Sequence, residues 1–332
     1  MQSFQLTIPK TLAAAVTALG DDAIFKAAGI DLLDRLKERK ERFANLVDLT
    51  RLPAEMGGIS KDGSRVRIGA LATLHQIEQA ASLQSTHLTA LREAAGEAAT
   101  PQVRRRATLG GNLLQRARCW YLRGAGFGCA HGGDGPTCLA REGENRYHAI
   151  LDAFDCVRVH PSNTATALCA LRATAHITGK NGKRTIPVRE LWPPFGLAAL
   201  AEHTLAPDEV LTAIELDAST AFDRSAYRES REKVSFDWPT VAAAVAVKLD
   251  GARVADVSIC LGAVSPTPHV AEEAAALLRG KAPTPAVLDE VVSTAFAKAQ
   301  PLAHNAYKIA QGKAVLRDTL VAALGKETVD GR

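Results

Sequence analysis

The chain has 332 residues, of which 47% are hydrophobic and 23% charged, and its formal net charge is +4. This composition is ordinary for a globular protein, the length allows two or three domains, and the small net charge gives no support for nucleic acid binding. No apolar run approaches the roughly 20 residues of a membrane span, and the first residues lack the basic and apolar regions of a secretory signal.

The N-terminal half predicts short helices and strands in mixed order. Apolar residues recur at helical spacing in three segments, the first of them closed by Gly20. These predicted helices cover residues 11–19, 31–40 and 73–81. Short apolar or alternating runs predict two strands, which cover residues 46–49 and 66–70.

The C-terminal half predicts a hairpin, a junction and a helical tail. An Asn-Gly pair favours a tight turn inside a hairpin over 173–186, after a helix over 163–172. The polar, acidic segment 217–225 is expected to join two lobes, and a strand is expected over 254–264 before a mostly helical tail from Glu272. Because helices and hairpins are mixed without regular strand–helix–strand alternation, the predicted fold class is α+β.

Four of the six cysteines lie within 38 residues. Cys119, Cys129, Cys138 and Cys156 are separated by nine, eight and seventeen residues, in a segment rich in glycine and without apolar periodicity. Such a segment cannot build its own core, and four thiolates are what a 4Fe–4S cluster needs. Zinc and free thiols are the alternatives, although structural zinc usually takes closer cysteine pairs and disulfides suit short secreted chains.

The other cysteines and the histidines of this region have simpler interpretations. Cys169 and Cys260 lie in apolar runs and are expected to be buried side chains without a ligand. His131, His148 and His160 stand isolated, and we expect packed or hydrogen-bonded histidines there rather than metal ligands.

Two glycine-bearing turns follow apolar runs, Ala27-Ala-Gly-Ile-Asp31 and Ala107-Thr-Leu-Gly-Gly-Asn112. A pyrophosphate needs backbone N–H groups that point at it without an intervening Cβ, and such turns can provide them. Neither turn matches G-x-G-x-x-G, so a Rossmann fold is not supported. Taken alone, each turn is weak evidence, and an ordinary tight turn is the more common explanation of such a pattern.

Thr100-Pro-Gln-Val-Arg104, followed by the turn at 107–112, resembles the second FAD loop of the flavin subunits of molybdenum hydroxylases. This family includes xanthine dehydrogenases, carbon monoxide dehydrogenase and bacterial aldehyde oxidoreductases. Further matches extend the resemblance over essentially the whole chain. They lie at residues 46–49, 68–73, 160–163, 184–187 and 305–308.

The cysteine segment narrows the resemblance. A minority of the family carries an insertion that binds a 4Fe–4S cluster, and Gln115-Arg-Ala-Arg-Cys119 is similar to the start of that insertion in periplasmic aldehyde oxidoreductases. The flavin subunit of 4-hydroxybenzoyl-CoA reductase also has an iron–sulfur insertion, with less similar spacing. Arg116, Arg118, Arg123 and Arg141 would then either raise the potential of the cluster or form a solvated surface.

The resemblance implies a two-lobed FAD-binding domain over residues 1–217, with a 4Fe–4S insertion at about 115–157, and a smaller α+β domain over 226–328. It implies that FAD lies extended against the two turns. The implied FAD contacts are Ala27, Ala28, Gly29, Ile30, Asp31, Thr108, Gly110, Gly111, Asn112 and Asn163. The implied cluster ligands are Cys119, Cys129, Cys138 and Cys156. Tyr227 and Tyr307 are candidate aromatic neighbours of the flavin, and packing in the core is an alternative of at least equal weight for both.

Five positions depart from the family pattern. The first FAD loop of the family is normally Ala-Gly-Gly-Thr, and this chain has Ala28 and Ile30 in place of the second and fourth residues. An alanine costs about 1 kcal/mol or more where the backbone needs a positive φ, and the missing hydroxyl removes a hydrogen bond to phosphate. Arg105 and Asn163 replace the usual Asn and Asp, and Glu229 replaces a common Lys. We therefore expect FAD to bind more loosely than in relatives.

The implied function is electron transfer within an oxidoreductase complex, without a catalytic residue for the organic substrate in this chain. Electrons would pass from a 2Fe–2S small subunit through FAD to an external acceptor. A large subunit with a molybdenum cofactor would oxidise the substrate, which is expected to be an aldehyde. The expected location is cytoplasmic, or periplasmic through co-export with a signal-bearing partner. The alternatives are the same fold without FAD, in which the cluster alone has a redox or structural role, and a separate zinc-stabilised binding protein.

Overall fold

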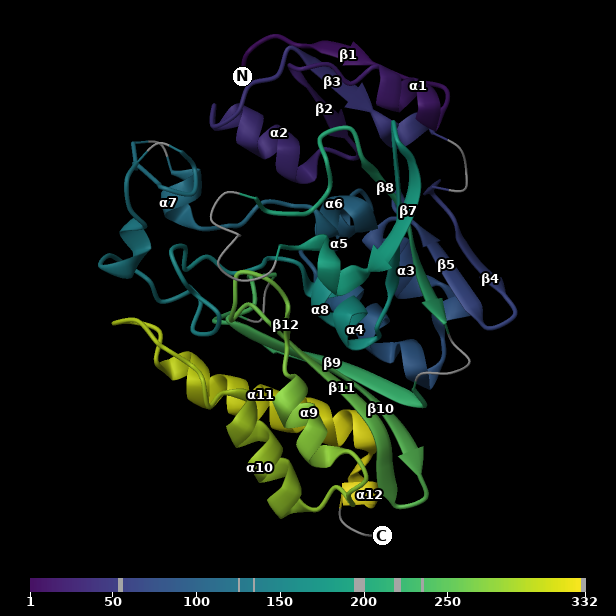
Figure 1. Cartoon of the computed structure of the whole chain (residues 1–332), viewed down its shortest axis with the longest axis vertical. Helices are drawn as coiled ribbons and strands as arrows, with labels where there is room; N and C mark the ends of the chain where they lie inside the picture. The colour runs from purple at the N-terminus through teal and green to yellow at the C-terminus, as the bar shows by residue number, and fades with distance from the viewer. Residues whose placement is uncertain are drawn as a thin grey trace.

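The computed structural model describes residues 1–52, 56–124, 126–133, 135–193, 201–217, 222–233 and 236–329. The N-terminal elements form a small layer at the top of Figure 1. Its parallel sheet has the order β1–β3–β2, and its helices are α1 and α2. The bounds are Gln5–Thr7 for β1, Leu12–Thr17 for α1, Ala23–Lys26 for β2, Ile30–Lys37 for α2 and Asn45–Asp48 for β3.

The middle of the chain forms an antiparallel sheet with the order β4–β5–β8–β6–β7. Its strands are Ile59–Asp62, Arg65–Gly69, Val210–Asp217, Thr174–Gly179 and Gly182–Pro187 in that order. Short helices pack beside this sheet (Figure 1). They are α3 Leu74–Gln79, α4 Thr89–Glu97, α5 Pro101–Arg104, α6 Leu109–Leu113 and α8 Asn163–Ala170. Helix α7, Trp120–Arg123, lies apart from them in the cysteine segment.

The C-terminal part is a second antiparallel sheet, with the order β12–β11–β10–β9 and helices on one face (Figure 1). The strands are β9 Arg224–Ser230, β10 Val241–Asp250, β11 Arg253–Gly262 and β12 His269–Val270. The helices are α9 Glu272–Leu278, α10 Pro285–Ala295, α11 Tyr307–Leu324 and α12 Lys326–Val329.

Both faces of this second sheet are buried, which explains the continuous apolar run of β10. Ala244 and Cys260 face the core that contains α4 and α8, while Val245 and Ile259 face the core formed with the C-terminal helices. Successive strand residues point to opposite faces, so a sheet packed on both sides needs apolar residues at every position. The predicted burial of Cys169 and Cys260 is confirmed.

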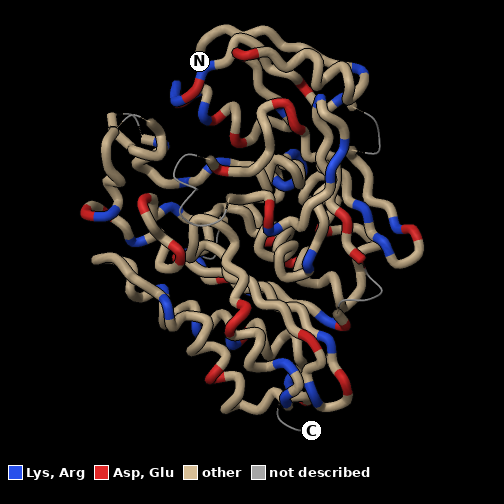
Figure 2. Tube along the Cα trace, in the orientation of Figure 1, with Lys and Arg blue, Asp and Glu red and all other residues tan. Residues whose placement is uncertain are grey.

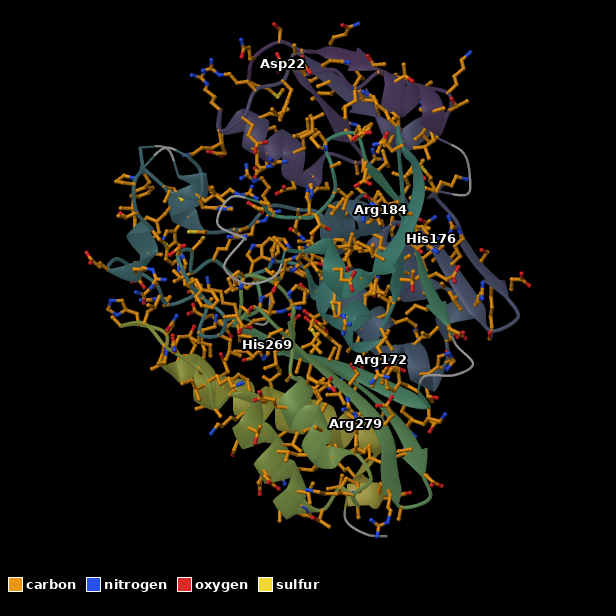
Figure 3. The ribbon with its side chains drawn as sticks, viewed as in Figure 1. Asp22, Arg172, His176, Arg184, His269 and Arg279 are labelled. Atoms are coloured by element: carbon orange, nitrogen blue, oxygen red, sulfur yellow. The ribbon has the colours of Figure 1, made fainter. Side chains whose placement is uncertain are left out.

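Charged residues connect helices α8 and α9 with strand β11 of the C-terminal sheet. Arg172, directly after α8, and Arg279, directly after α9, both contact the carboxylate of Asp256 in β11, with Arg172 Nη2 at 3.0 Å and Arg279 Nε at 3.2 Å. Figure 3 labels both arginines. Elsewhere basic and acidic residues are interspersed along the described chain (Figure 2), and none of the described helices has the length and apolarity to cross a membrane.

The predicted α+β class is confirmed, and the hairpin β6–β7 turns at the expected residues. The helix predicted over 11–19 is shorter than expected, because Thr11 caps its start and it ends at Thr17, before Gly20. The helix predicted over 31–40 begins at Ile30 and ends at Lys37. Strand β8, central in the middle sheet, was not predicted, although its run of β-branched and apolar residues is typical of a buried strand.

Candidate cofactor sites

A cavity of about 920 Å³ separates the N-terminal layer from the rest of the chain and has the size of a small-molecule site. All ten residues expected to contact FAD line it. They are Ala27, Ala28, Gly29, Ile30, Asp31, Thr108, Gly110, Gly111, Asn112 and Asn163. The structure therefore brings together two turns that lie about 80 residues apart in the sequence.

The first turn joins β2 to α2. Gly29 caps the start of α2 with a φ of 82°, the left-handed conformation in which glycine is unstrained. Ala28 does not have a positive φ, so the strain expected for an alanine at this position does not arise. The ammonium group of Lys26 fixes the turn, because Nζ donates to Ala27 O at 3.0 Å and to Asp48 Oδ2 at 3.0 Å.

The second turn begins helix α6. Thr108 Oγ1 accepts a hydrogen bond from the Gly111 N–H at 3.2 Å, which is an N-terminal cap. Gly110 lies against the neighbouring strand end, where its N–H donates to Ala70 O at 2.8 Å. A Cβ at Gly110 would lie 3.1 Å from that oxygen, so a side chain would push the turn away from the sheet.

The two asparagines of the cavity have their amide groups oriented by neighbours. Asn112 Oδ1 accepts from Ser162 Oγ and Thr164 Oγ1, each at 2.6 Å, which leaves its NH2 group as a donor for the cavity. Asn163 Nδ2 donates to Glu229 Oε2 at 2.6 Å, which leaves its carbonyl oxygen as an acceptor. Burial raises the pKa of Glu229, which has a side chain only 5% exposed.

Of the two interpretations for Tyr227 and Tyr307, the structure does not support the place beside the flavin. Tyr227 is buried in the core and donates its hydroxyl to Glu229, and the hydroxyl of Tyr307 donates to a backbone carbonyl 3.0 Å away. Neither tyrosine lines the cavity, whereas Phe236 and Trp238 do and are 53% and 48% exposed. The sequence signal for these two was an aromatic pair in a short segment between strands, which by itself indicates only a loop.

The four predicted ligand cysteines lie in the segment around α7. Cys129 is buried against Leu122, and Cys119 packs beside them. The thiols of Cys138 and Cys156 are hydrogen-bonded to each other, which lowers the pKa of Cys138. Burial raises the pKa of Cys119 to about 11. The described residues contain no group of three or more His, Cys, Asp or Glu side chains set to hold a single metal ion.

The three histidines expected to be packed or hydrogen-bonded have such contacts. His148 Nε2 lies 3.2 Å from Cys119 Sγ, and burial lowers the pKa of His148 to about 4. His131 Nε2 lies 2.9 Å from Glu202 Oε1, and the ring of His160 packs edge-on against Trp192. His148 was not recognised as a neighbour of a ligand cysteine, because nothing local in the sequence connects it with Cys119.

A network of ion pairs holds the start of the cysteine segment on helix α2. The carboxylate of Asp31 accepts from Arg123 Nη2 at 2.7 Å and from the Arg116 N–H at 3.1 Å, and it lies 2.9 Å from Arg118 Nη2. Burial alone would raise the pKa of Asp31, but the charges of Arg118 and Arg123 hold it below its usual range. The side chains of Arg116, Arg118 and Arg123 are therefore paired with carboxylates and are not a solvated surface.

The later part of the segment is held by helix α11 of the second domain. Lys308 is fully buried, and Nζ donates to the carbonyl oxygens of Tyr147, His148 and Ala263 at 3.3, 2.9 and 2.6 Å. Asn305 Nδ2 also donates to His148 O, at 3.2 Å. The cysteine segment thus makes contacts with both domains.

Comparison with known sequences identifies the family of the two domains. Residues 2–217 match the family described as the FAD binding domain in molybdopterin dehydrogenase, and residues 225–326 match the CO dehydrogenase flavoprotein C-terminal domain. The aldehyde oxidoreductase FAD-binding subunit PaoB of Escherichia coli K12 is 32% identical over 303 residues, which cover 91% of each chain.

Carbon monoxide dehydrogenases are similar in both sequence and structure. The medium chain from Hydrogenophaga pseudoflava is 30% identical over 302 residues, covering 90% of this chain and 88% of that one. A crystal structure of carbon monoxide dehydrogenase from the same organism, without the molybdenum-pyranopterin moiety, superimposes with a TM-score of 0.76 at 27% identity and covers 98% of both chains.

Proposed function

Because the chain belongs to the FAD-binding subunits of the molybdenum hydroxylases, we propose that it carries electrons through FAD in an aldehyde-oxidising complex. The electrons come from a 2Fe–2S small subunit and leave to an external acceptor, while a separate large subunit holds the molybdenum cofactor. The observation that carries the proposal is the cavity walled by both glycine turns. PaoB, named as a subunit of an aldehyde oxidoreductase, supports the substrate class.

The residues of the cavity suit an extended dinucleotide. Gly29, Gly110 and Gly111 allow a pyrophosphate to approach the backbone, and Thr108 keeps the N-terminal turn of α6 in place. Asn112 offers a donor and Asn163 an acceptor, so a ligand with both kinds of polar atom can be oriented between them. When bound, FAD supplies the exchange between one-electron and two-electron transfer.

We further propose that Cys119, Cys129, Cys138 and Cys156 hold a 4Fe–4S cluster. Three of these side chains are half-buried and one is buried, within a segment that ion pairs and backbone contacts hold on both domains. Four thiols in one glycine-rich segment are the donor set that such a cluster takes, and it supplies one-electron transfer when bound. Cys169 and Cys260 lie in a separate core and take no part.

Purification of the complex from its native host tests the subunit role and the FAD assignment, and iron and sulfide analysis of this chain after separation from the 2Fe–2S subunit tests the 4Fe–4S cluster. We expect the chain to co-elute with a molybdenum-containing large subunit and a 2Fe–2S subunit, and the absorption spectrum to show flavin bands on a broad iron–sulfur background. Elution of the chain alone, carrying flavin and reducing acceptors with an aldehyde, would contradict the subunit role. An iron–sulfur background without flavin would contradict the FAD assignment, and a colourless chain would contradict both cofactors.

A further inference from the structure

Arg118 belongs to both proposed cofactor sites. It directly precedes Cys119 in the chain, and its side chain lines the cavity that contains the two glycine turns. Its Nη2 lies 2.9 Å from Asp31 Oδ1, in the first turn of helix α2. Its guanidinium carbon lies 4.8 Å from the ring centre of Trp238, which also lines the cavity. The guanidinium is therefore held between the first glycine turn and an aromatic wall.

Arg118 has unused hydrogen-bonding capacity at this place. Nη2 donates to Gln115 Oε1 at 3.1 Å and pairs with Asp31, while Nη1 lies 3.8 Å from Asp34, beyond hydrogen-bond distance. Its Nε is buried without a hydrogen-bond partner in the described structure. A guanidinium carries five N–H donors, and Nη1 has its acidic neighbour only at 3.8 Å, so Arg118 can still donate to a ligand in the cavity.

The other basic residues of this wall are more fully engaged. Lys26 is bound to a carboxylate and a carbonyl, and two arginines each contact two carboxylates. These contacts are Arg35 with Asp31 and Glu41, and Arg116 with Glu41 and Glu202. Arg35 Nε also lacks a hydrogen-bond partner among the described residues, but it lies 3.1 Å from Asp31 Oδ2, and Arg35 Nη1 donates to Glu41. Arg118 has Nη1 3.8 Å from Asp34 and is therefore better placed than Arg35 to bind an additional anion.

We propose that Arg118 binds the pyrophosphate of FAD, so that the cysteine segment supplies part of the flavin site. This inference rests on the proposed placement of FAD in the cavity. Guanidinium groups bind phosphate through paired, charge-assisted hydrogen bonds, and the first turn has Ile30 where the family pattern has a hydroxyl. The arginine adds a strong donor on the side of the cavity where that hydroxyl is missing.

The same contact couples the two cofactors. Asp31 holds Arg118 together with the Arg116 N–H and Arg123, so the position of Arg118 depends on an ordered cysteine segment. When the cysteine segment loses its cluster, Arg118 leaves the cavity wall and FAD binds more weakly. By thermodynamic linkage, bound FAD favours the ordered segment and hence cluster retention.

The test is FAD titration of the intact complex after removal of its flavin, with iron content measured in parallel. Arg118→Gln should raise the Kd for FAD about ten- to a hundredfold at unchanged iron content. Its affinity for ADP, which has the pyrophosphate but no flavin, should fall by a similar factor. Arg118→Lys, which keeps the charge and loses the planar fork, should lie in between. If the Gln variant loses iron, the Lys variant decides: weaker FAD at full iron supports the contact, and an unchanged Kd overturns it.

Arg123→Gln is the matched control, because Arg123 pairs with the same Asp31 carboxylate but does not line the cavity. A rise in Kd clearly smaller than that of Arg118→Gln supports the proposal, because Arg123 affects FAD only through the order of the segment, whereas equal losses in both variants would mean that Arg118 only anchors the segment. Cys138→Ser should weaken FAD together with iron loss, and a normal Kd there would overturn the coupling. Gly111→Val tests the placement of FAD itself: normal FAD binding in this variant contradicts the proposed cavity, independently of Arg118.

Discussion

Asn163 and Glu229, 66 residues apart in the sequence, share a hydrogen bond of 2.6 Å that joins helix α8 to strand β9. Both are departures from the family pattern, in which Asp and Lys are usual. An aspartate at 163 would place two carboxylates against each other, and a lysine at 229 would face an amide nitrogen. The two unusual residues are thus in direct contact with each other through an amide–carboxylate hydrogen bond.

This contact predicts strong coupling between substitutions. Asn163→Asp and Glu229→Lys should each destabilise the protein by about 1–3 kcal/mol. The first places two carboxylates against each other, and the second places an ammonium beside Arg231 and removes the acceptor of Tyr227. The double variant should recover more than 1 kcal/mol of the summed loss. Urea unfolding of the four proteins measures this coupling, and additive losses would show that the two positions act independently.

The first glycine turn predicts unequal effects for its two unusual residues. Ile30→Thr should tighten FAD binding about tenfold, since a hydroxyl at the start of α2 can donate to phosphate. Ala28→Gly should give no gain and can cost up to about 1 kcal/mol, because Ala28 has no positive φ and glycine only adds freedom to the unfolded chain. FAD titration of both single variants checks this, and a gain from Ala28→Gly alone would contradict it.

Asp48 predicts a pH dependence for the support of the first turn. Burial alone would raise the pKa of Asp48, but hydrogen bonds from Thr50 and Lys26 hold it below the ordinary value of 3.8. The stabilisation that ionised Asp48 provides is thus complete above about pH 4, and it is lost as the pH falls through the lowered pKa of Asp48 in the folded protein. Asp48→Asn should cost about 1–2 kcal/mol at pH 7 and lose less stability than the native protein on further acidification. Asp62→Asn, at an exposed position of β4, is the control.

The proposed cluster ligands predict that serine substitutions at the six cysteines have two different effects on iron content. Serine at Cys119, Cys129, Cys138 or Cys156 should remove or convert the cluster, because a serine oxygen is a poor replacement for a thiolate ligand to iron. Serine at Cys169 or Cys260 should leave the iron and sulfide content unchanged. Iron and sulfide analysis decides, and an unchanged content in Cys138→Ser would refute the ligand set.

Lys308 predicts that helix α11 stabilises the cysteine segment. Lys308→Met should lower the free energy of unfolding by about 2–4 kcal/mol, because three buried carbonyl groups lose their donor. Iron retention should fall as well, since two of these carbonyls belong to residues 147 and 148 of the segment. Lys313→Met, on the same helix, should change neither quantity, and an equal loss there would point to a general effect on α11.

The sequence alone was sufficient wherever the signal was local. The Asn-Gly turn of β6–β7 and the two glycine turns are set by residues within a few positions of each other, where backbone preferences dominate. The ordered motifs also identified the family and both glycine turns of the cavity. The ten FAD contacts and the four cluster ligands are still predictions, although the former all line one cavity.

Only the tertiary structure showed which distant side chains meet. The basic spacing of Arg118 and Arg123 is visible in the sequence, but their partner Asp31 comes from a turn about 90 residues earlier. The pairing of Asn163 with Glu229 and the choice of Trp238 over Tyr227 at the cavity are of the same kind. Such contacts depend on how sheets and helices pack, and packing energy is a sum over many residues that no short pattern contains.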